Sequence, residues 1–97
     1  MTIEHVQNAQ DGTFFVPGNN EHLAEMTYRR HDPKTLVIDH TEVSDALKGK
    51  NVGLQLVQSA VEYARTEGLK IVPVCSFARA MFDKKPELRD VLQTEPE

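Results

Sequence analysis

The sequence predicts an α+β fold in which an antiparallel meander of four strands precedes a β-α-β crossover and a C-terminal helix. Apolar residues alternate with polar ones in the first half of the chain, which is typical of half-buried strands. They recur at helical spacing over residues 52–67, and a short apolar segment follows that helix. At 97 residues, the chain has the length of one domain, residues 1–97, with a core of about residues 3–92.

Four strands are expected before the long helix, separated by turns rich in Gly, Pro, Asn and Asp. They cover residues 3–7, 13–16, 22–31 and 35–43. In the third strand, Ala24, Met26 and Tyr28 share one face, which indicates that this face is buried. In the fourth strand, Leu36-Val37-Ile38 is apolar on both faces, as in a central strand that is covered on both sides.

The second half of the chain predicts the crossover. An amphipathic helix covers residues 52–67, and Gly68 stands where a left-handed residue commonly ends a helix. A strand over residues 71–75, a helix over 77–83 and a further turn over 86–92 follow. A crossover of this kind normally joins parallel strands. Because proline cannot donate to a sheet ladder, Pro73 predicts either an edge strand or one that diverges from its neighbour.

The segment Lys48–Gly53 opens the long helix and is a candidate phosphate site. Free N–H groups and a partial positive charge at a helix N-terminus attract phosphate. Glycines at positions 49 and 53 would let the backbone approach an anion, and Asn51 tolerates positive φ. The pattern is neither a Walker loop nor a dinucleotide fingerprint. An ordinary loop that caps a helix is the alternative interpretation.

Cys75 is a second candidate, because it ends the strand after the crossover helix, where ligands of such units tend to bind. Its thiol could act as a nucleophile if a helix N-terminus or a cation lowers its pKa. The alternative is a small buried residue. His40 and Glu42 share one face at the end of the fourth strand, and either could accept a proton from an amine. A solvent-facing strand end is the simpler interpretation of Glu42.

Composition and residue spacing argue against several classes of function. The formal net charge of −4 argues against nucleic acid or an anionic membrane as the main partner. His5, His22 and His31 form no recognisable ligand spacing, so no metal site is predicted. A single cysteine excludes an internal disulfide. Without an export signal or a membrane-spanning segment, a cytoplasmic location is expected. Arg79, Lys84 and Lys85 could neutralise a cofactor phosphate or form a solvated basic face.

Several segments together resemble the GCN5-related N-acetyltransferases. The family's pyrophosphate signature is Gln/Arg-x-x-Gly-x-Gly/Ala, and Lys48-x-x-Asn51-x-Gly53 lies in register with it, with Lys and Asn as departures. The chain is most similar to the small YjdJ-like branch. That similarity rests on four further motifs: His40-Thr41-Glu42-Val43, Tyr63-Ala64, Val72-Pro73-Val74-Cys75-Ser76-Phe77 and Pro86-Glu87.

The resemblance implies acetyl-CoA as cofactor and acetyl transfer to an unidentified amine. It implies splayed strands around the pantetheine arm, a thioester near Cys75, and an acceptor site without the superfamily's usual N-terminal helices. Cys75 and His40 are the expected catalytic residues. The cofactor is expected to contact His40, Thr41, Glu42, Val43, Lys48, Gly49, Lys50, Asn51, Val52, Gly53, Cys75, Ser76, Arg79 and Phe82.

Two other functions stay open at this point. The domain could bind or sense acyl-CoA without catalysis, or it could be an interaction domain that binds no CoA. Monomer and homodimer are both compatible with the sequence, since an exposed edge strand could pair across a two-fold axis.

Overall fold

The computed structural model describes residues 2–93 and confirms the predicted order of elements. The strands and helices follow the expected sequence. They are β1 (Glu4–Gln7), β2 (Asp11–Pro17), β3 (His22–Asp32), β4 (Thr35–Val43), η1 (Asp45–Leu47), α1 (Val52–Glu67), β5 (Lys70–Pro73), α2 (Ser76–Lys84) and η2 (Pro86–Val91). One 3-10 helix, η2, falls on the turn predicted over residues 86–92, and the other, η1, is added.

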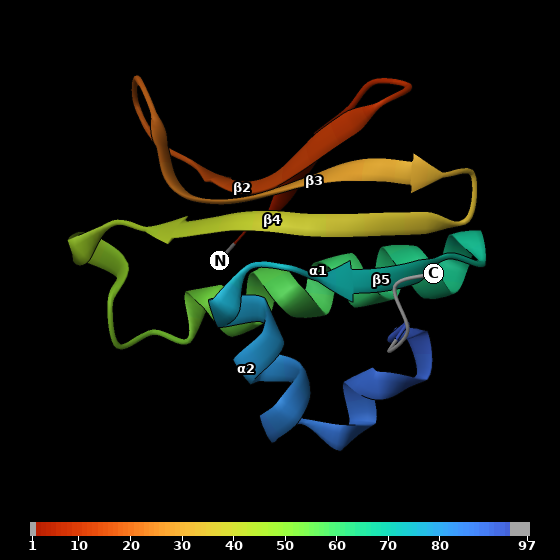
Figure 1. Cartoon of the computed structure of the whole chain (residues 1–97). Coiled ribbons are helices and arrows are strands. Elements are labelled where there is room, and N and C mark those ends of the chain that lie inside the picture. The colour runs from red at the N-terminus through yellow and green to blue at the C-terminus, as the bar shows by residue number, and fades with distance from the viewer. Residues whose placement is uncertain (1, 94–97) are drawn as a thin grey trace.

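The five strands form one mixed sheet whose spatial order, β1-β2-β3-β4-β5, is the order along the chain. The first four pair antiparallel, and β4 pairs with β5 in parallel through the α1 crossover. Figure 1 shows the meander on one side of the molecule, with α1, α2 and η2 gathered on the other. The predicted α+β class, with its meander and β-α-β unit, is confirmed.

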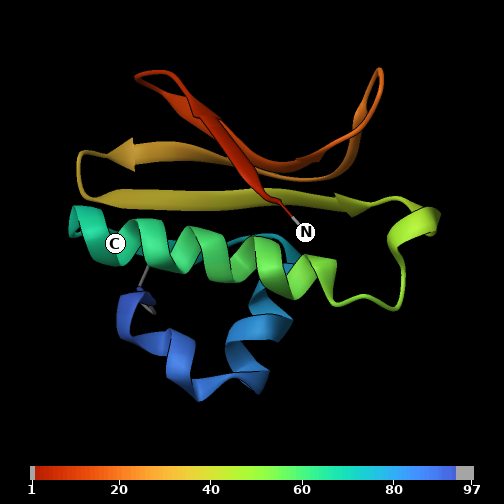
Figure 2. The same ribbon diagram turned by 180° about the vertical axis from the view of Figure 1, so that it is seen from behind.

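The core lies between the helices and one face of this sheet, the inner face. Figure 2 shows α1 running along β4 over much of its length. Sheet side chains in this core include Phe14, Met26 and Tyr28, while Leu56, Val57 and Val61 come from α1 and Phe82 comes from α2. No described helix is both long and apolar enough to span a membrane.

A β-bulge in β4 decides which side chains face which way. Thr27 pairs with His40 while Tyr28 pairs with Ile38, so Asp39 is an extra residue. Beyond the bulge, Thr41 lies opposite the buried Met26 and therefore faces inward. His40 and Glu42 face outward, on the sheet surface away from the helices.

The ends of α1 explain why it covers residues 52–67. Asn51 precedes it at φ 58° and is the one described non-glycine residue with positive φ. Gly68 follows it at φ 71°, and its backbone N–H donates to the Ala64 carbonyl. The C-terminal glycine prediction is confirmed, because only glycine adopts this conformation without a steric cost.

β5 is shorter than expected and ends at Pro73. Its pairing with β4 stops at Ile38–Pro73, where the backbone N–H groups of Val74 and Cys75 both donate to the Ile38 carbonyl. The chain then turns into α2, so residues 74 and 75 do not continue the strand. Pro73 is tolerated for both predicted reasons, since β5 is an edge strand and it leaves its neighbour at this point.

Candidate functional site

The site begins where β4 and β5 separate. Past Ile38, β4 continues to Val43, and no described strand pairs with it on its β5 side. The residues that follow β5 turn into α2 instead. Thr41 reaches across this separation, and its Oγ1 lies 3.4 Å from the Cys75 Sγ. The splay that the sequence resemblance implies is therefore present in the backbone pairing, with one side-chain contact spanning it.

Cys75 is the residue immediately before α2, and its environment favours the thiolate. Burial alone would raise the pKa of the Cys75 thiol. The Thr41 hydroxyl, together with backbone N–H groups of Phe77 and Ala78 in the first turn of α2, outweighs burial, so the pKa is lowered. Half-buried rather than sealed in the core, this side chain differs from the small buried cysteine of the alternative interpretation.

The loop before α1 lies on the same side of β4 as Cys75. Gly49 adopts φ 83°, and Asn51 takes a left-handed conformation in which its side chain makes no capping hydrogen bond. The first-turn N–H groups of α1 therefore have no side-chain cap from Asn51. Lys48 pairs with Asp45 at 2.9 Å, and Lys50 is exposed.

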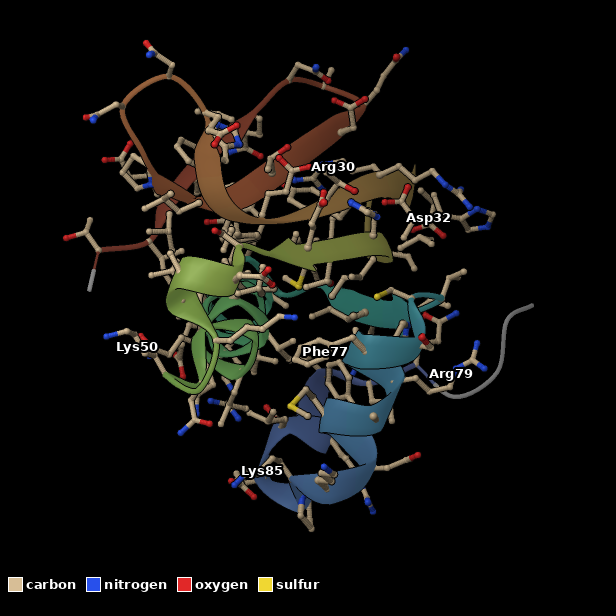
Figure 3. All side chains as sticks on the ribbon, turned by 90° about the vertical axis from the view of Figure 1, so that its left-hand side faces the viewer. Arg30, Asp32, Lys50, Phe77, Arg79 and Lys85 are labelled. Carbon is tan, nitrogen blue, oxygen red and sulfur yellow. The ribbon has the colours of Figure 1, made fainter. Side chains whose placement is uncertain are left out.

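Gly53 has a neighbour that the sequence did not reveal. A Cβ at this position would lie 2.3 Å from the Cζ atom of Phe77, so the Phe77 ring rests directly on the first turn of α1. Figure 3 shows Phe77, near the start of α2, with its side chain between that helix and the loop that carries Lys50. The ring is 36% exposed, which is unusual for a large apolar side chain packed between two helices.

These elements enclose a cavity of about 230 Å³. Its lining combines the loop, the first turn of α1, the end of β4 and α2, namely Val43, Leu47, Lys48, Gly49, Asn51, Val52, Gly53, Leu54, Phe77 and Met81. Six of the predicted cofactor-binding residues thus border one cavity. Uncapped helix N–H groups at one side and apolar side chains at the other suit a ligand with a phosphate end and a thin apolar arm.

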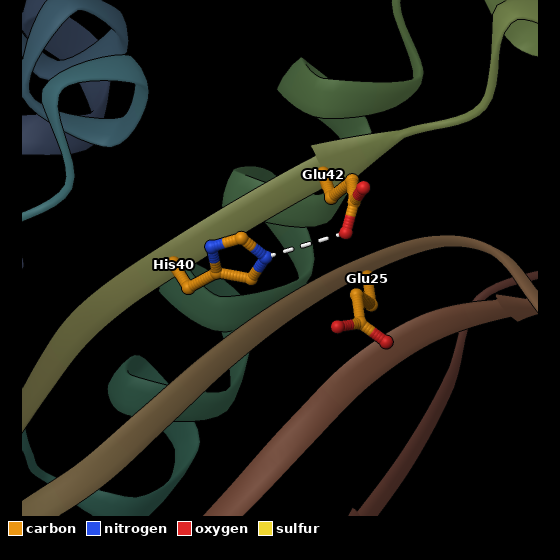
Figure 4. A group of neighbouring side chains, drawn as sticks. All are labelled: Glu25, His40 and Glu42. Atoms are coloured by element: carbon orange, nitrogen blue, oxygen red, sulfur yellow. Dashed lines mark ion pairs between the residues drawn. The ribbon is translucent and has the colours of Figure 1, made fainter.

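His40 lies elsewhere, on the outer face of the sheet. Its Nε2 is 3.5 Å from Glu42 Oε1, and Glu25 lies directly opposite Glu42 on β3, as Figure 4 shows. Ligand atoms of these three residues lie within 4.8 Å of one another. The expected pairing of His40 with Glu42 on one face is confirmed. The two predicted catalytic residues lie apart, because His40 faces outward from β4 whereas Cys75, before α2, lies against the inward-facing Thr41.

The remaining predicted residues divide by burial. Ser76 and Arg79 are exposed on α2, where Arg79 donates to the Pro73 carbonyl at 3.4 Å, and Lys84 is exposed at the end of the same helix. Phe82 is only 1% exposed and belongs to the core. Its expected contact with the cofactor needs correction, because its side chain offers no surface to a ligand and stabilises α2 by packing.

Sequence reasoning missed Phe77 and Glu25. In the sequence Phe77 is only one member of a motif, although a glycine at residue 53 is a signal that something packs closely there. Glu25 lies beside His40 and Glu42 because β3 pairs with β4, and spacing along one strand gives no sign of a neighbour on another strand.

Comparison with known proteins agrees with this geometry. A sequence model of the family described as GCN5-related N-acetyl-transferase matches residues 13–91. The solution structure of a GCN5-like candidate N-acetyltransferase from Staphylococcus aureus superimposes with a TM-score of 0.76 at 40% identity, covering 97% of this chain and 91% of that one.

Two more distant relatives are also similar. Protein NATD1 of Danio rerio is 23% identical over 86 residues, which is 89% of this chain and 77% of that protein. A GNAT family acetyltransferase of Elizabethkingia anophelis, solved with acetyl-CoA bound, has a TM-score of 0.60 at 18% identity, covering 79% of this chain and 53% of the other. The family match, the S. aureus structure and the splayed strands agree: this chain belongs to the GCN5-related N-acetyltransferase family.

Proposed function

We propose that this acetyltransferase domain binds acetyl-CoA between β4 and α2 and transfers its acetyl group to an amine. The observation that carries this proposal is the cavity of about 230 Å³, which lies between the first turn of α1, Val43 at the end of β4, and α2. Pyrophosphate would bind at the first turn of α1, where Gly49 and Asn51 hold the backbone in left-handed conformations. Lys50 is available as a counter-charge.

The unpaired end of β4 would hold the pantetheine arm. Backbone groups of residues 40–43 on the β5 side have no strand partner, so they can pair with the arm's amides. Val43 and Phe77 supply apolar contact along the same path. This arrangement would bring the thioester toward Thr41 and Cys75.

In direct transfer, the lone pair of a neutral amine attacks the thioester carbonyl. A C–N bond forms, the C–S bond breaks, and CoA leaves as the thiolate while the amine loses one proton. The hydroxyl of Thr41 and the N–H groups at the start of α2 are the local donors that could stabilise charge there.

One observation favours a covalent variant of this reaction. The lowered pKa of Cys75 increases the thiolate fraction, and a thiolate can accept the acetyl group before the amine does. Acyl-CoA binding without transfer is the competing function. It predicts the same ligand contacts but no acetylated product.

An amide NMR titration with acetyl-CoA followed by intact mass measurement tests these functions. Shifts centred on residues 40–53 and Cys75 would support the ligand site. A stable gain of one acetyl group that is absent in Cys75→Ala would support the covalent variant, and acetylated amine without that gain would support direct transfer. No shifts at millimolar acetyl-CoA would refute the proposed site.

A further inference from the structure

Asp39 is the extra residue of the β-bulge in β4. Thr27 of β3 pairs with His40 and Tyr28 pairs with Ile38, so no β3 residue lies in register with Asp39. Its side chain nevertheless has a partner on β3, because the Thr27 hydroxyl donates to Asp39 Oδ1 at 2.6 Å. This side-chain hydrogen bond connects the two strands at the point where their backbone register shifts.

A second contact at the bulge is weaker. Arg29 Nε lies 3.9 Å from Asp39 Oδ2, and the two side chains are 56% and 39% exposed. An ion pair with this exposure contributes little to stability. Thr27 is half-buried, and its short hydrogen bond to a carboxylate is therefore the contact that holds the extra residue in place.

The bulge decides which residues of β4 meet Cys75. In a regular strand, two residues three positions apart face opposite sides of the sheet. Ile38 and Thr41 both face inward, because the extra residue between them shifts the alternation by one. The Cys75 backbone N–H donates to the Ile38 carbonyl at 3.0 Å, and Cys75 Sγ lies 3.4 Å from Thr41 Oγ1. Cys75 is thus held from both sides of the bulge.

A strand without the bulge would lose one of these two contacts. Alternation from Ile38 would then turn His40 inward and Thr41 outward. The Thr41 hydroxyl would lie on the far face of the sheet from Cys75, and the thiol would lose the side-chain partner that helps to stabilise its thiolate. The environment of the thiol therefore depends on whatever fixes the bulge.

We propose that Asp39 is a positioning residue for Cys75. Its carboxylate, bound by the Thr27 hydroxyl, fixes the bulge, and the bulge places Thr41 against the thiol. Asp39 acts through Thr41, because its own side chain is bound on the outer face of the sheet. Its place in the reaction rests on the proposed transferase function, whereas its effect on the thiol does not.

Alkylation of Cys75 by iodoacetamide measures this effect without acetyl-CoA. Thr27→Val keeps a branched side chain but removes the hydroxyl that binds Asp39. It should slow alkylation about two- to fourfold at neutral pH and speed it at strongly alkaline pH, because a thiolate that loses a donor has a higher pKa and is a better nucleophile. Thr13→Val is the matched control, since Thr13 pairs with Thr27 and is also half-buried, and it should leave the curve unchanged.

Two variants of Asp39 itself test the same contact. Asp39→Asn keeps an oxygen that can accept from the Thr27 hydroxyl but loses the charge, so it should follow the parent curve. Asp39→Ala removes the acceptor and should behave like Thr27→Val. A parent-like curve for Asp39→Ala, or one for Asp39→Asn that matches Asp39→Ala, would contradict the proposed hydrogen bond.

A double variant separates positioning from a general loosening of the fold. If Asp39 acts through Thr41, Thr27→Val should change nothing further once Thr41→Val has removed the contact with Cys75. A loosened fold would instead speed alkylation at every pH in both backgrounds. That result, additive effects of the two substitutions, or identical curves for Thr27→Val and Thr13→Val would overturn the proposal.

An acetylation assay separates this inference from the proposed function. The Cys75 thiolate would attack the thioester carbonyl of acetyl-CoA, a new C–S bond would form, and CoA would leave as the thiolate. Intact mass should show slower acetylation of Thr27→Val than of the parent at neutral pH. No gain in the parent would refute covalent transfer, while the alkylation curves still decide the role of Asp39. Equal acetylation and equal alkylation of both proteins would refute the positioning role alone.

Discussion

Removing the Thr41 hydroxyl should change how the reactivity of Cys75 depends on pH. Thr41→Val keeps the shape of the side chain but deletes the oxygen that lies 3.4 Å from Cys75 Sγ. A hydrogen bond to a charged group contributes about 1.5–3 kcal/mol, and the lower figure suits this partly exposed contact. The loss of about 1.5 kcal/mol corresponds to roughly tenfold less thiolate at neutral pH.

The expected change in alkylation rate is smaller, because a thiolate with a higher pKa is also a better nucleophile. With a Brønsted coefficient of about 0.4–0.5, iodoacetamide should react roughly fourfold more slowly at neutral pH and about threefold faster at strongly alkaline pH. The two pH–rate curves should therefore cross. Mass spectrometry of the alkylated chain gives both rates, because Cys75 is the only cysteine.

Thr41→Ser is the control, since it keeps the hydroxyl and should follow the parent curve. Thr41→Val curves that superimpose on the parent at every pH would show that Thr41 does not stabilise the thiolate. A uniform slowing at all pH values would point to changed access instead. Either result would contradict a thiolate-stabilising role for the Thr41–Cys75 contact across the strand separation.

Three further outcomes are expected. Gly53→Ala should displace the Phe77 ring and shift its aromatic NMR signals, because the added Cβ would meet that ring; unchanged Phe77 signals would contradict this contact. Acidification below about pH 6.5 should destabilise the fold, because burial lowers the pKa of His5 and the unfolded chain takes up the proton first; His5→Gln should make this dependence shallower in urea unfolding. Burial raises the pKa of Tyr28 to about 12, so stability should fall as the pH rises above 10, and Tyr28→Phe should lack the absorbance step near pH 12.

Local patterns predict the fold well because each depends on near neighbours in sequence. Alternation over β3 and helical spacing over α1 are both confirmed, and Gly68 ends α1 as expected. The predicted end of β5 is wrong because apolar character continues through Val74 and Cys75. The two hydrogen bonds to the Ile38 carbonyl that turn this segment toward α2 involve a distant strand.

The site is harder to predict, because it depends on which faces the side chains occupy. Spacing correctly places His40 and Glu42 together, but their position relative to Cys75 depends on the bulge at Asp39. One extra residue reverses the alternation, and neither hydrophobic periodicity nor motif spacing detects it. The expectation that Phe82 contacts the ligand also fails because of the face that its side chain occupies. Only the packing of α2 shows that Phe82 points into the core.

The sequential strand order has a consequence for how the domain opens. Four strands are joined by hairpins and can hold together through local contacts, whereas β5 and α2 attach only after the long α1 crossover. Thr41 and Cys75, 34 positions apart, thus belong to two units that can separate without loss of the meander. Amide hydrogen exchange should be faster in β5 and α2 than in the β3–β4 ladder, and a bound ligand that contacts both units would slow it by holding them together.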